Sequence, residues 1–374
     1  KQLLKYAIYH SNLFEDLGFK YLGPIDGHNL DELTEALMVA KMMQRPCLVH
    51  IYTKKGKGYA PAEDNSGEYH GLPPKKDDDN NCKGECFTDA FGKALLSFAD
   101  NDNSIYAVTA AMKYGTGLQH FYKAFPERFF DVGIAEQHAV TFSAGLASQG
   151  KLPVFAVYSS FLQRSYDQLI HDCAIEKRHI VLGIDRAGFV GEDGETHHGL
   201  FDVAMLTTVP GVTVYSPSDT AELSQCLEQA LYKDKGVVAV RYPRGCELYR
   251  SGTKAYSDFR HVSNKSRKLI FTYGRISAYA YTIHGVDVLQ AIKIFPIADE
   301  IINICLAYDE IYAFEEGERE GGIAQKLCTA LALAGFKGRF TITAVDGFVR
   351  HADVATQLHN AMLDADGMRK ITGE

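Results

Sequence analysis

The stretch DVGIAEQHAVTFSAGLA, residues 131–147, decides the fold. A short apolar run typical of a buried strand precedes Glu136, and the residues after it have the apolar spacing of a buried helix. A charge at such a junction is costly to bury unless it is paired or used, although a helix dipole alone can stabilise a glutamate there. The stretch therefore predicts a strand–helix unit in which Glu136 is either an ordinary helix-start residue or a functional group.

Strand and helix patterns alternate on both sides of this junction, from residue 87 to residue 250. Five short apolar runs predict buried strands: SIYAVTA (104–110), LPVFAVYSS (152–160), HIVLGIDRA (179–187), VTVYSPSD (212–219) and GVVAVRYPR (236–244). Four amphipathic stretches predict helices: residues 87–99, 135–150, 163–177 and 219–234. Such alternation is typical of an α/β fold with a parallel sheet covered on both faces.

The remaining sequence predicts further domains on either side. Residues 1–75 contain a helix over 29–43, capped by Asn29, and a strand that leads into a lysine- and glycine-rich loop (46–58). Residues 76–86 are charged and follow two prolines, which is typical of a linker. Residues 255–374 repeat the α/β rhythm, with strands predicted at 268–274, 285–297, 310–317 and 340–348 and a helix at 321–335.

Composition narrows the classes of function. The 374 residues carry a net charge of −8 and a sequence pI near 6.0, which argues against a nucleic-acid-binding protein. No apolar run reaches the roughly 18 residues that a membrane span needs, and the first residues lack a signal-peptide pattern. The eight cysteines are scattered without a framework spacing, which predicts reduced thiols in a cytosol-like compartment.

Polar side chains follow several of the predicted strands. In open α/β sheets ligands bind at the carboxyl ends of the strands, so we expect these residues to lie at one rim. The candidates are Glu136, Tyr158, Ser159, Ser160, Arg164, Asp185, Arg186, Glu192, Asp193, His197, His198, Arg241 and Arg244.

Each group of candidates has a second interpretation. The loop GFVGEDGETHHG (188–199) suits proton transfer by histidine and carboxylate, or it is a solvated surface loop. Asp193, His197 and His198 lack a recognisable metal-ligand spacing, which disfavours a metal site there. The arginines Arg186, Arg241 and Arg244 hold a phosphate or form ion pairs. The CKGEC segment (82–86) has too few ligands for zinc and is interpreted as linker with free thiols.

Six motifs in a fixed order resemble the 1-deoxy-D-xylulose-5-phosphate synthases, a family of transketolase-like thiamine diphosphate enzymes. They are TKKGKGYAPAE followed by His70, DVGIAEQHAVTFSAGLA, YSSFLQRSYDQLIHDCAI, DRAGFVGEDGETHHGLFD, PSD and RYPRG. The resemblance covers almost the whole chain and is weakest over 250–300. It implies a transketolase-like α/β fold: the tail of a diphosphate-binding domain, a pyrimidine-binding domain and a transketolase C-terminal domain. It also implies a homodimer.

The resemblance further implies roles for residues around the cofactor. Glu136 matches the glutamate that contacts N1′ of the aminopyrimidine ring and favours its imino tautomer. Phe161 matches the aromatic residue that packs on the pyrimidine, Ile134 the apolar residue that braces the bent cofactor, and Lys55 a lysine near it.

The same resemblance implies the substrates. The family condenses pyruvate with glyceraldehyde 3-phosphate to give 1-deoxy-D-xylulose 5-phosphate and CO₂. His197 and His70 match histidines with proton-handling roles. Five positions match residues around the substrates, with the phosphate held by Arg186 and Arg244: Tyr158, Arg164, Arg186, Asp193 and Arg244.

The sequence departs from the family in one respect. Members carry a Gly-Asp-Gly motif and a later Asn-Asn that bind magnesium and diphosphate, whereas this chain has no GDG and its only NN, at 80–81, lies in the predicted linker. No magnesium ligand can therefore be named, and we expect the chain alone to bind the cofactor weakly and to turn over poorly or not at all. Two alternatives stay open: a non-catalytic or split-partner subunit, and the β-type chain of a 2-oxo acid dehydrogenase. A cytoplasmic location, or a plastid stroma in a eukaryote, is expected.

Overall fold

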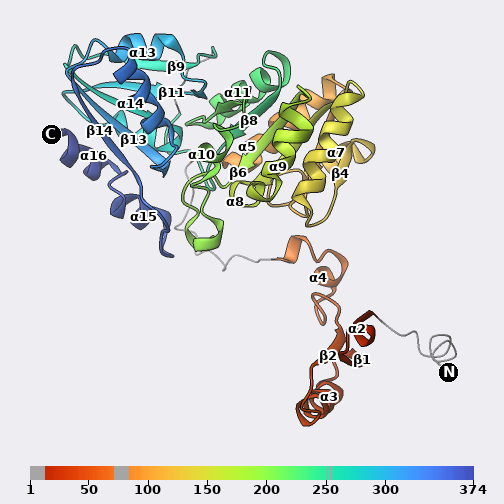
Figure 1. Cartoon of the computed structure of the whole chain (residues 1–374). Helices are drawn as coiled ribbons and strands as arrows, with labels where there is room; N and C mark the ends of the chain where they lie inside the picture. Colours follow the sequence, from red (N-terminus) through yellow and green to blue (C-terminus); the bar gives the residue numbers. More distant parts are fainter. Residues whose placement is uncertain (1–12, 71–83, 251, 253–254) are drawn as a thin grey trace. The chain divides into compact units, whose positions relative to one another are not determined.

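The computed structural model describes residues 13–70, 84–250, 252 and 255–374, and divides the chain into two units, residues 1–80 and 81–374 (Figure 1). Most of the predicted linker lies outside the described residues.

The first unit is built around one β–α–β motif. The parallel strands β1 (Lys20–Asp26) and β2 (Cys47–Tyr52) are joined by helix α3 (Leu30–Met42). The side chain of Asn29 accepts a hydrogen bond from the backbone N–H of Glu32, so the predicted N-cap is confirmed. The other elements are α2 (Leu13–Asp16), α4 (Ala60–Asp64) and a 3₁₀ turn (Glu68–His70).

The second unit contains a seven-stranded sheet, most of which is drawn from yellow to green in Figure 1. Its strands lie in the order β12-β7-β8-β6-β5-β3-β4, and every neighbouring pair except β12–β7 is parallel. The strands are β3 (Ile105–Thr109), β4 (Phe129–Asp131), β5 (Leu152–Tyr158), β6 (Ile180–Asp185), β7 (Thr213–Tyr215), β8 (Val237–Arg241) and β12 (Lys293–Phe295). The predicted parallel sheet is confirmed.

Helices cover both faces of this sheet, as the alternating pattern predicts. Helices α5 (Phe87–Asn101) and α11 (Thr220–Tyr232) share one apolar cluster, while α7 (Glu136–Ser148) contributes to the other. Burial of these apolar faces stabilises the layers by roughly 25 cal/mol per Å². Shorter helices complete the unit: α6 (Gln119–Ala124), α8 (Ser159–Leu162), α9 (Tyr166–Gln168) and α10 (Asp202–Leu206).

The helix predicted over 163–177 is not continuous. A 3₁₀ turn (Gln163–Ser165) is followed by α9 and by a π-helical segment (Leu169–Ala174). Arg164 in the tight turn faces Glu136, whereas Leu169 and Cys173 remain fully buried in the core. The change from a 3₁₀ turn to a π-helical segment lets Arg164 contact Glu136 while Leu169 and Cys173 point into the core.

A five-stranded sheet, coloured towards blue in Figure 1, forms the C-terminal part of the second unit. Its order is β14-β13-β10-β11-β9, and only β9 is antiparallel to its neighbour. The strands are β9 (Phe259–Val262), β10 (Lys268–Tyr273), β11 (Asp287–Ala291), β13 (Glu310–Glu318) and β14 (Arg339–Val345). The helices are α12 (Ser277–Ala280), α13 (Asp299–Cys305), α14 (Ile323–Leu333), α15 (Val354–Asn360) and α16 (Ala365–Thr372).

The strand predicted over 285–297 divides between the two sheets. β11 belongs to the five-stranded sheet, whereas β12 pairs antiparallel with β7 at the edge of the seven-stranded sheet. Ile292 lies between them and packs into the apolar cluster of α5 and α11. One apolar run thus contributes side chains to two hydrophobic cores, which the spacing of its apolar residues alone does not reveal.

The space available at Gly183 yields a test of the packing. A Cβ on Gly183, in the central strand β6, would lie 2.4 Å from Cζ of Phe91. We expect Gly183→Ala to lower the free energy of unfolding by about 1–3 kcal/mol, because overpacking strains a close-packed core. The measurement is urea unfolding. The matched control is Gly145→Ala in helix α7, where no atom lies within 4 Å of the added Cβ, and where stability should hold or rise by up to about 1 kcal/mol. Equal stability of the two variants would contradict the packing described here.

Candidate active site at the carboxyl ends of the strands

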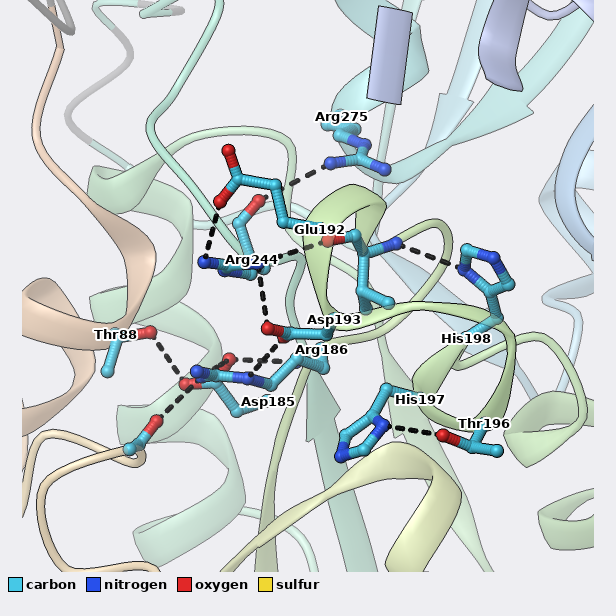
Figure 2. A network of polar contacts seen from close by, with 12 residues as sticks. Thr88, Asp185, Arg186, Glu192, Asp193, Thr196, His197, His198, Arg244 and Arg275 are labelled. Carbon is cyan, nitrogen blue, oxygen red and sulfur yellow. Dashed lines mark hydrogen bonds and ion pairs between the residues drawn. The ribbon is translucent and has the colours of Figure 1, made fainter. Parts of the chain in front are cut away.

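A buried carboxylate lies at the centre of the polar rim (Figure 2). Asp185 ends strand β6 and is fully buried. One of its oxygens accepts a hydrogen bond from the hydroxyl of Thr88 (2.7 Å), and the other accepts from the backbone N–H and the guanidinium of Arg186 (2.7 and 3.0 Å). Burial raises the pKa of Asp185, and the neighbouring Arg186 opposes that shift.

Arg186 is held in an unusual backbone conformation. Its φ of 62° is in the left-handed region, which costs a non-glycine residue about 1–3 kcal/mol. Its guanidinium also donates to the carbonyl oxygen of Gly115 at 2.7 Å and lies 3.9 Å from the ring centroid of Tyr158. These contacts fix the direction of the side chain at the strand end.

Asp193 connects two arginines that come from different strands. Its carboxylate accepts a hydrogen bond from Arg244 at 2.9 Å and forms an ion pair with Arg186 at 3.5 Å. Arg244 also donates to the carbonyl oxygen of Val190 and forms an ion pair with Glu192 at 3.6 Å. Figure 2 shows both guanidinium groups pointing towards Asp193. Two partly buried guanidinium groups so arranged can bind a phosphate or a carboxylate.

Aromatic contacts continue from Arg186 to Glu136. Tyr158 stacks on Phe161 with ring centroids 5.6 Å apart, and the guanidinium of Arg164 lies 4.8 Å from the Phe161 centroid. Arg164 then donates to Glu136 at 2.6 Å. Glu136 is 1% exposed and is the first residue of α7, so its charge is offset by an arginine and by the positive end of a helix. The predicted helix start and the burial of Glu136 are confirmed. The apolar run directly before Glu136 is not the strand, because β4 ends at Asp131 and residues 132–135 form an irregular connection.

The two neighbouring histidines face different surroundings. His197 is partly exposed, lies with its ring centroid 5.2 Å from that of Phe161, and contacts the hydroxyl of Thr196 at 2.9 Å. His198 is buried: its Nδ1 accepts from the backbone N–H of Val190 at 3.2 Å, and its Nε2 lies 3.2 Å from the side chain of Gln357. Burial lowers the pKa of His198, although the charge of Glu316 opposes the shift. His197 therefore belongs to the rim, and His198 anchors the loop.

The C-terminal part of the unit holds this loop from the other side. Arg275 pairs with the buried Glu316 and donates to the carbonyl oxygens of Phe189 (2.8 Å) and Arg244 (3.4 Å). Glu316 in turn accepts from the backbone N–H of Phe189 at 2.7 Å. Removal of one partner of such a buried ion pair strongly destabilises the fold, because the other charge stays buried without compensation. Arg275 and Glu316 therefore determine where the loop and Arg244 lie.

The rim brings together eight of the predicted site residues: Glu136, Tyr158, Phe161, Arg164, Arg186, Asp193, His197 and Arg244. Ile134 is 81% exposed. Lys55 and His70 contact each other, but they belong to the first unit, so their relation to this rim stays a prediction.

The structure excludes the phosphate-binding interpretation for Arg241. It is buried and pairs with Asp202 at 2.9 Å, which places it outside the anion-binding group, so the simple ion-pair alternative holds for it. Sequence reasoning did not single out Arg275 or Glu316. Arg275 lies in the segment YGRIS (273–277), and Glu316 lies in FEEGE (314–318). Each charged residue follows the apolar residues of a predicted strand, and this pattern could have suggested a buried ion pair.

The cysteine prediction needs a second correction. Cys246 is disulfide-bonded, so the thiols are not all reduced. Cys82 lies outside the described residues. Within the described part of the chain, no cluster of three or more His, Cys, Asp or Glu side chains could hold a metal ion. The described helices include none with both the length and the apolar character required to cross a membrane.

Two family models match the chain. Residues 86–247 match the pyrimidine-binding domain of transketolase, and residues 1–53 match an N-terminal model of 1-deoxy-D-xylulose-5-phosphate synthase. The resemblance predicted from the motifs is confirmed.

The curated relatives carry the same family name. A 1-deoxy-D-xylulose-5-phosphate synthase of Brevibacillus brevis is 41% identical over 389 residues, covering 98% of this chain and 61% of the relative. One of Clostridium kluyveri is 47% identical over 291 residues, covering 75% of this chain and 46% of the relative. The chain thus spans about half to three-fifths of the length of these relatives.

Solved structures confirm the predicted transketolase-like fold. A chain described as a split gene transketolase, inactive beta4 tetramer, aligns with a TM-score of 0.67 at 23% identity, covering 76% of this chain and 96% of the other. A transketolase of Campylobacter jejuni aligns with a TM-score of 0.64 at 14% identity, covering 99% and 70%.

The burial of His198 predicts how stability depends on pH. Its folded pKa lies below the ordinary 6.5, so the unfolded chain takes up the proton first as the pH falls. The contribution of His198 is complete above that pH and is lost on acidification. We expect His198→Gln to lose less stability than the wild type between about pH 7.5 and about pH 5.5, measured by urea unfolding. The control is His171→Gln, whose side chain is 61% exposed and which should behave as the wild type. An equal loss in His198→Gln and wild type would contradict the assignment.

Proposed function

We propose that this chain, a relative of the 1-deoxy-D-xylulose-5-phosphate synthases, condenses pyruvate with D-glyceraldehyde 3-phosphate to give 1-deoxy-D-xylulose 5-phosphate and CO₂. The single observation that carries the proposal is the continuous line of contacts from Glu136 through Arg164, Phe161 and Tyr158 to Arg186. These residues come from separate motifs of the family, and the fold places them at one rim.

The residues at the Glu136 end fit the pyrimidine half of thiamine diphosphate. A buried carboxylate at a helix start can accept a hydrogen bond from a ring nitrogen and favour one tautomer, because a charge-assisted bond is strong where water is excluded. The partly buried ring of Phe161 offers a face for the pyrimidine. The cofactor, when bound, supplies a stabilised carbanion. The protein's part is to orient it and to manage protons.

For His197 we propose a proton-handling role beside this site, and its contacts support the proposal. It contacts Phe161 and lies on the same loop as Asp193. An imidazole is the side chain best suited to both giving and accepting a proton under physiological conditions. We assign it the proton transfer that accompanies attack on the aldehyde. His70 is a second candidate for a proton-handling role, and Lys55 stays a candidate for contact with the cofactor.

The other end of the line fits the phosphate of the acceptor. Arg186 and Arg244 approach one point from two strands, and their guanidinium groups match phosphate oxygens. Tyr158 contacts Arg186 and Arg164 contacts Glu136, so both belong to the line of contacts that joins the two ends of the proposed site. A three-carbon aldehyde phosphate suits a site with a polar group at each end.

The described residues do not account for the diphosphate and the magnesium ion. They contain no cluster of metal-ligating side chains, and the whole sequence lacks a GDG motif. We propose that a further segment of the polypeptide or a partner chain holds this half of the cofactor, and that the protein works as a homodimer. Residues 1–374 alone are then expected to bind cofactor weakly, because the non-reacting part of a ligand supplies much of its binding energy.

A split-partner subunit is the second candidate function. The fold of the chain matches nearly the full length of a protein described as an inactive tetramer of a split gene transketolase. The test is product formation from pyruvate, glyceraldehyde 3-phosphate, magnesium and excess thiamine diphosphate. Product supports the synthase. A chain that forms none, and that stays inactive when the first third of a homologous synthase is added, supports the non-catalytic subunit.

Glu136→Gln tests the cofactor end of the line. The amide keeps the size of the side chain and can accept from Arg164, but it loses the charge that favours the imino tautomer. We expect kcat to fall by about 10²–10⁴-fold with little change in stability. Kinetics, measured for this and the next variant with the first third of a homologous synthase supplied, and urea unfolding are the measurements. The control is Glu127→Gln, at an exposed position before β4. A Glu136→Gln variant that keeps most of its kcat would remove Glu136 from the mechanism.

Arg244→Ala tests the phosphate end. Loss of one charge-assisted hydrogen bond of about 1.5–3 kcal/mol should raise KM for glyceraldehyde 3-phosphate roughly 10- to 100-fold. KM for D-glyceraldehyde, which lacks the phosphate, should stay unchanged. Arg250→Ala, an exposed arginine six residues further along the chain, is the control and should leave both values unaffected. Equal losses with both aldehydes would show that Arg244 does not bind the phosphate.

A further inference from the structure

Two cysteines that are far apart in the sequence, Cys86 and Cys246, lie in contact close to Arg244. Cys86 immediately precedes helix α5, and Cys246 follows strand β8, two residues after Arg244. Their sulfur atoms lie 2.7 Å apart. Neither residue takes part in the proposed reaction, so the contact needs a separate explanation.

The backbone holds the two residues opposite each other. Cys86 and Cys246 form an antiparallel bridge in which the N–H of Phe87 donates to Gly245 (3.0 Å) and the N–H of Glu247 donates to Glu85 (3.1 Å). The flanking residues make these hydrogen bonds, so the cysteines occupy a non-hydrogen-bonded pair. In such pairs the Cα atoms are about 4.5 Å apart and the side chains lie close together. That separation falls within the range of disulfides, so a bond requires no backbone rearrangement.

The chemical surroundings favour exchange at this pair. Cys246 is already disulfide-bonded, and both residues are partly exposed. Lys93 is close enough to Cys86 for their charges to interact, and a neighbouring cation promotes the thiolate. Cys173 and Cys305 differ in both respects, because burial raises the pKa of each thiol to about 12.

We propose that Cys86 and Cys246 form a reversible disulfide that clamps the start of helix α5 to the loop carrying Arg244. The Cys86 thiolate attacks Sγ of Cys246 and forms the new bond. The sulfur previously bonded to Cys246 leaves as a thiolate and takes up the proton that Cys86 gave up. The exchange is balanced and needs no external oxidant. A small dithiol opens the clamp by the same chemistry.

The clamp would act on both arginines of the rim. Thr88, two residues after Cys86, donates to Asp185, which holds Arg186. Arg244 lies two residues before Cys246 and contacts Asp193. The disulfide thus joins the supports of the two guanidinium groups. When it opens, the Arg244 loop stays attached to the start of α5 by the weaker backbone hydrogen bonds of Phe87 and Glu247.

Peptide mapping tests the bond itself. The full chain is alkylated without reduction, digested with trypsin and analysed by mass spectrometry. Cleavage after Lys83 separates Cys82 from Cys86, so GECFTDAFGK (84–93) linked to GCELYR (245–250) identifies the proposed bond without ambiguity. We expect this linked pair in the wild type, its loss in Cys86→Ser and Cys246→Ser, and its retention in Cys328→Ser. The chain is also incubated with mixtures of a small thiol and its disulfide before alkylation. If Cys246 is linked only to the peptide that contains Cys82 under every such condition, the proposal is overturned.

Amide hydrogen exchange tests the clamp. Oxidised wild-type chain should exchange more slowly than reduced chain over 242–250 and the first turn of α5, and the difference should vanish in Cys246→Ser. A bond that forms without this protection would overturn the clamp. Neither measurement requires catalysis, so failure of the proposed reaction leaves both results interpretable.

Discussion

The buried pair of Asp185 and Arg186 is the constraint on which the rest of the rim depends. A carboxylate at the end of a central strand is costly to bury, and the guanidinium of the next residue offsets that cost only if the backbone turns back on itself. This explains the positive φ of Arg186. The same turn places the guanidinium beside Tyr158 and Asp193, so one electrostatic requirement orients three functional side chains.

The second support comes from a different part of the chain. Arg275 and Glu316 bind the backbone of Phe189, at the start of the loop that carries Asp193 and His197. Backbone groups rather than side chains are held, so the loop's position is independent of its solvent-facing residues. A glycine-rich loop that would otherwise be mobile is thereby fixed against a rigid sheet.

The sequence was informative where chemistry is local. The junction at Glu136, the strand ends and the motif order could be predicted because each depends on residues close together in the chain. The pairing of Arg275 with Phe189 spans 86 residues and follows from packing between two sheets, which no spacing pattern records. The change in winding after Arg164 was missed because it depends on a contact with Glu136, 28 residues away in the sequence. Predictions for Lys55 and His70 stay open because they depend on how two units meet.

The charges at the rim determine what the phosphate of an acceptor substrate must displace when it binds. Arg186 and Arg244 are already offset by Asp185, Glu192 and Asp193, so the group carries no excess positive charge. A phosphate entering the proposed site must compete with at least one of these carboxylates. Asp193 is the one shared by both arginines, on a loop and partly exposed, whereas Asp185 is fully buried. The internal carboxylate keeps both guanidinium groups aligned before the ligand arrives, and the cost of binding becomes the displacement of one loop residue rather than the ordering of two long side chains.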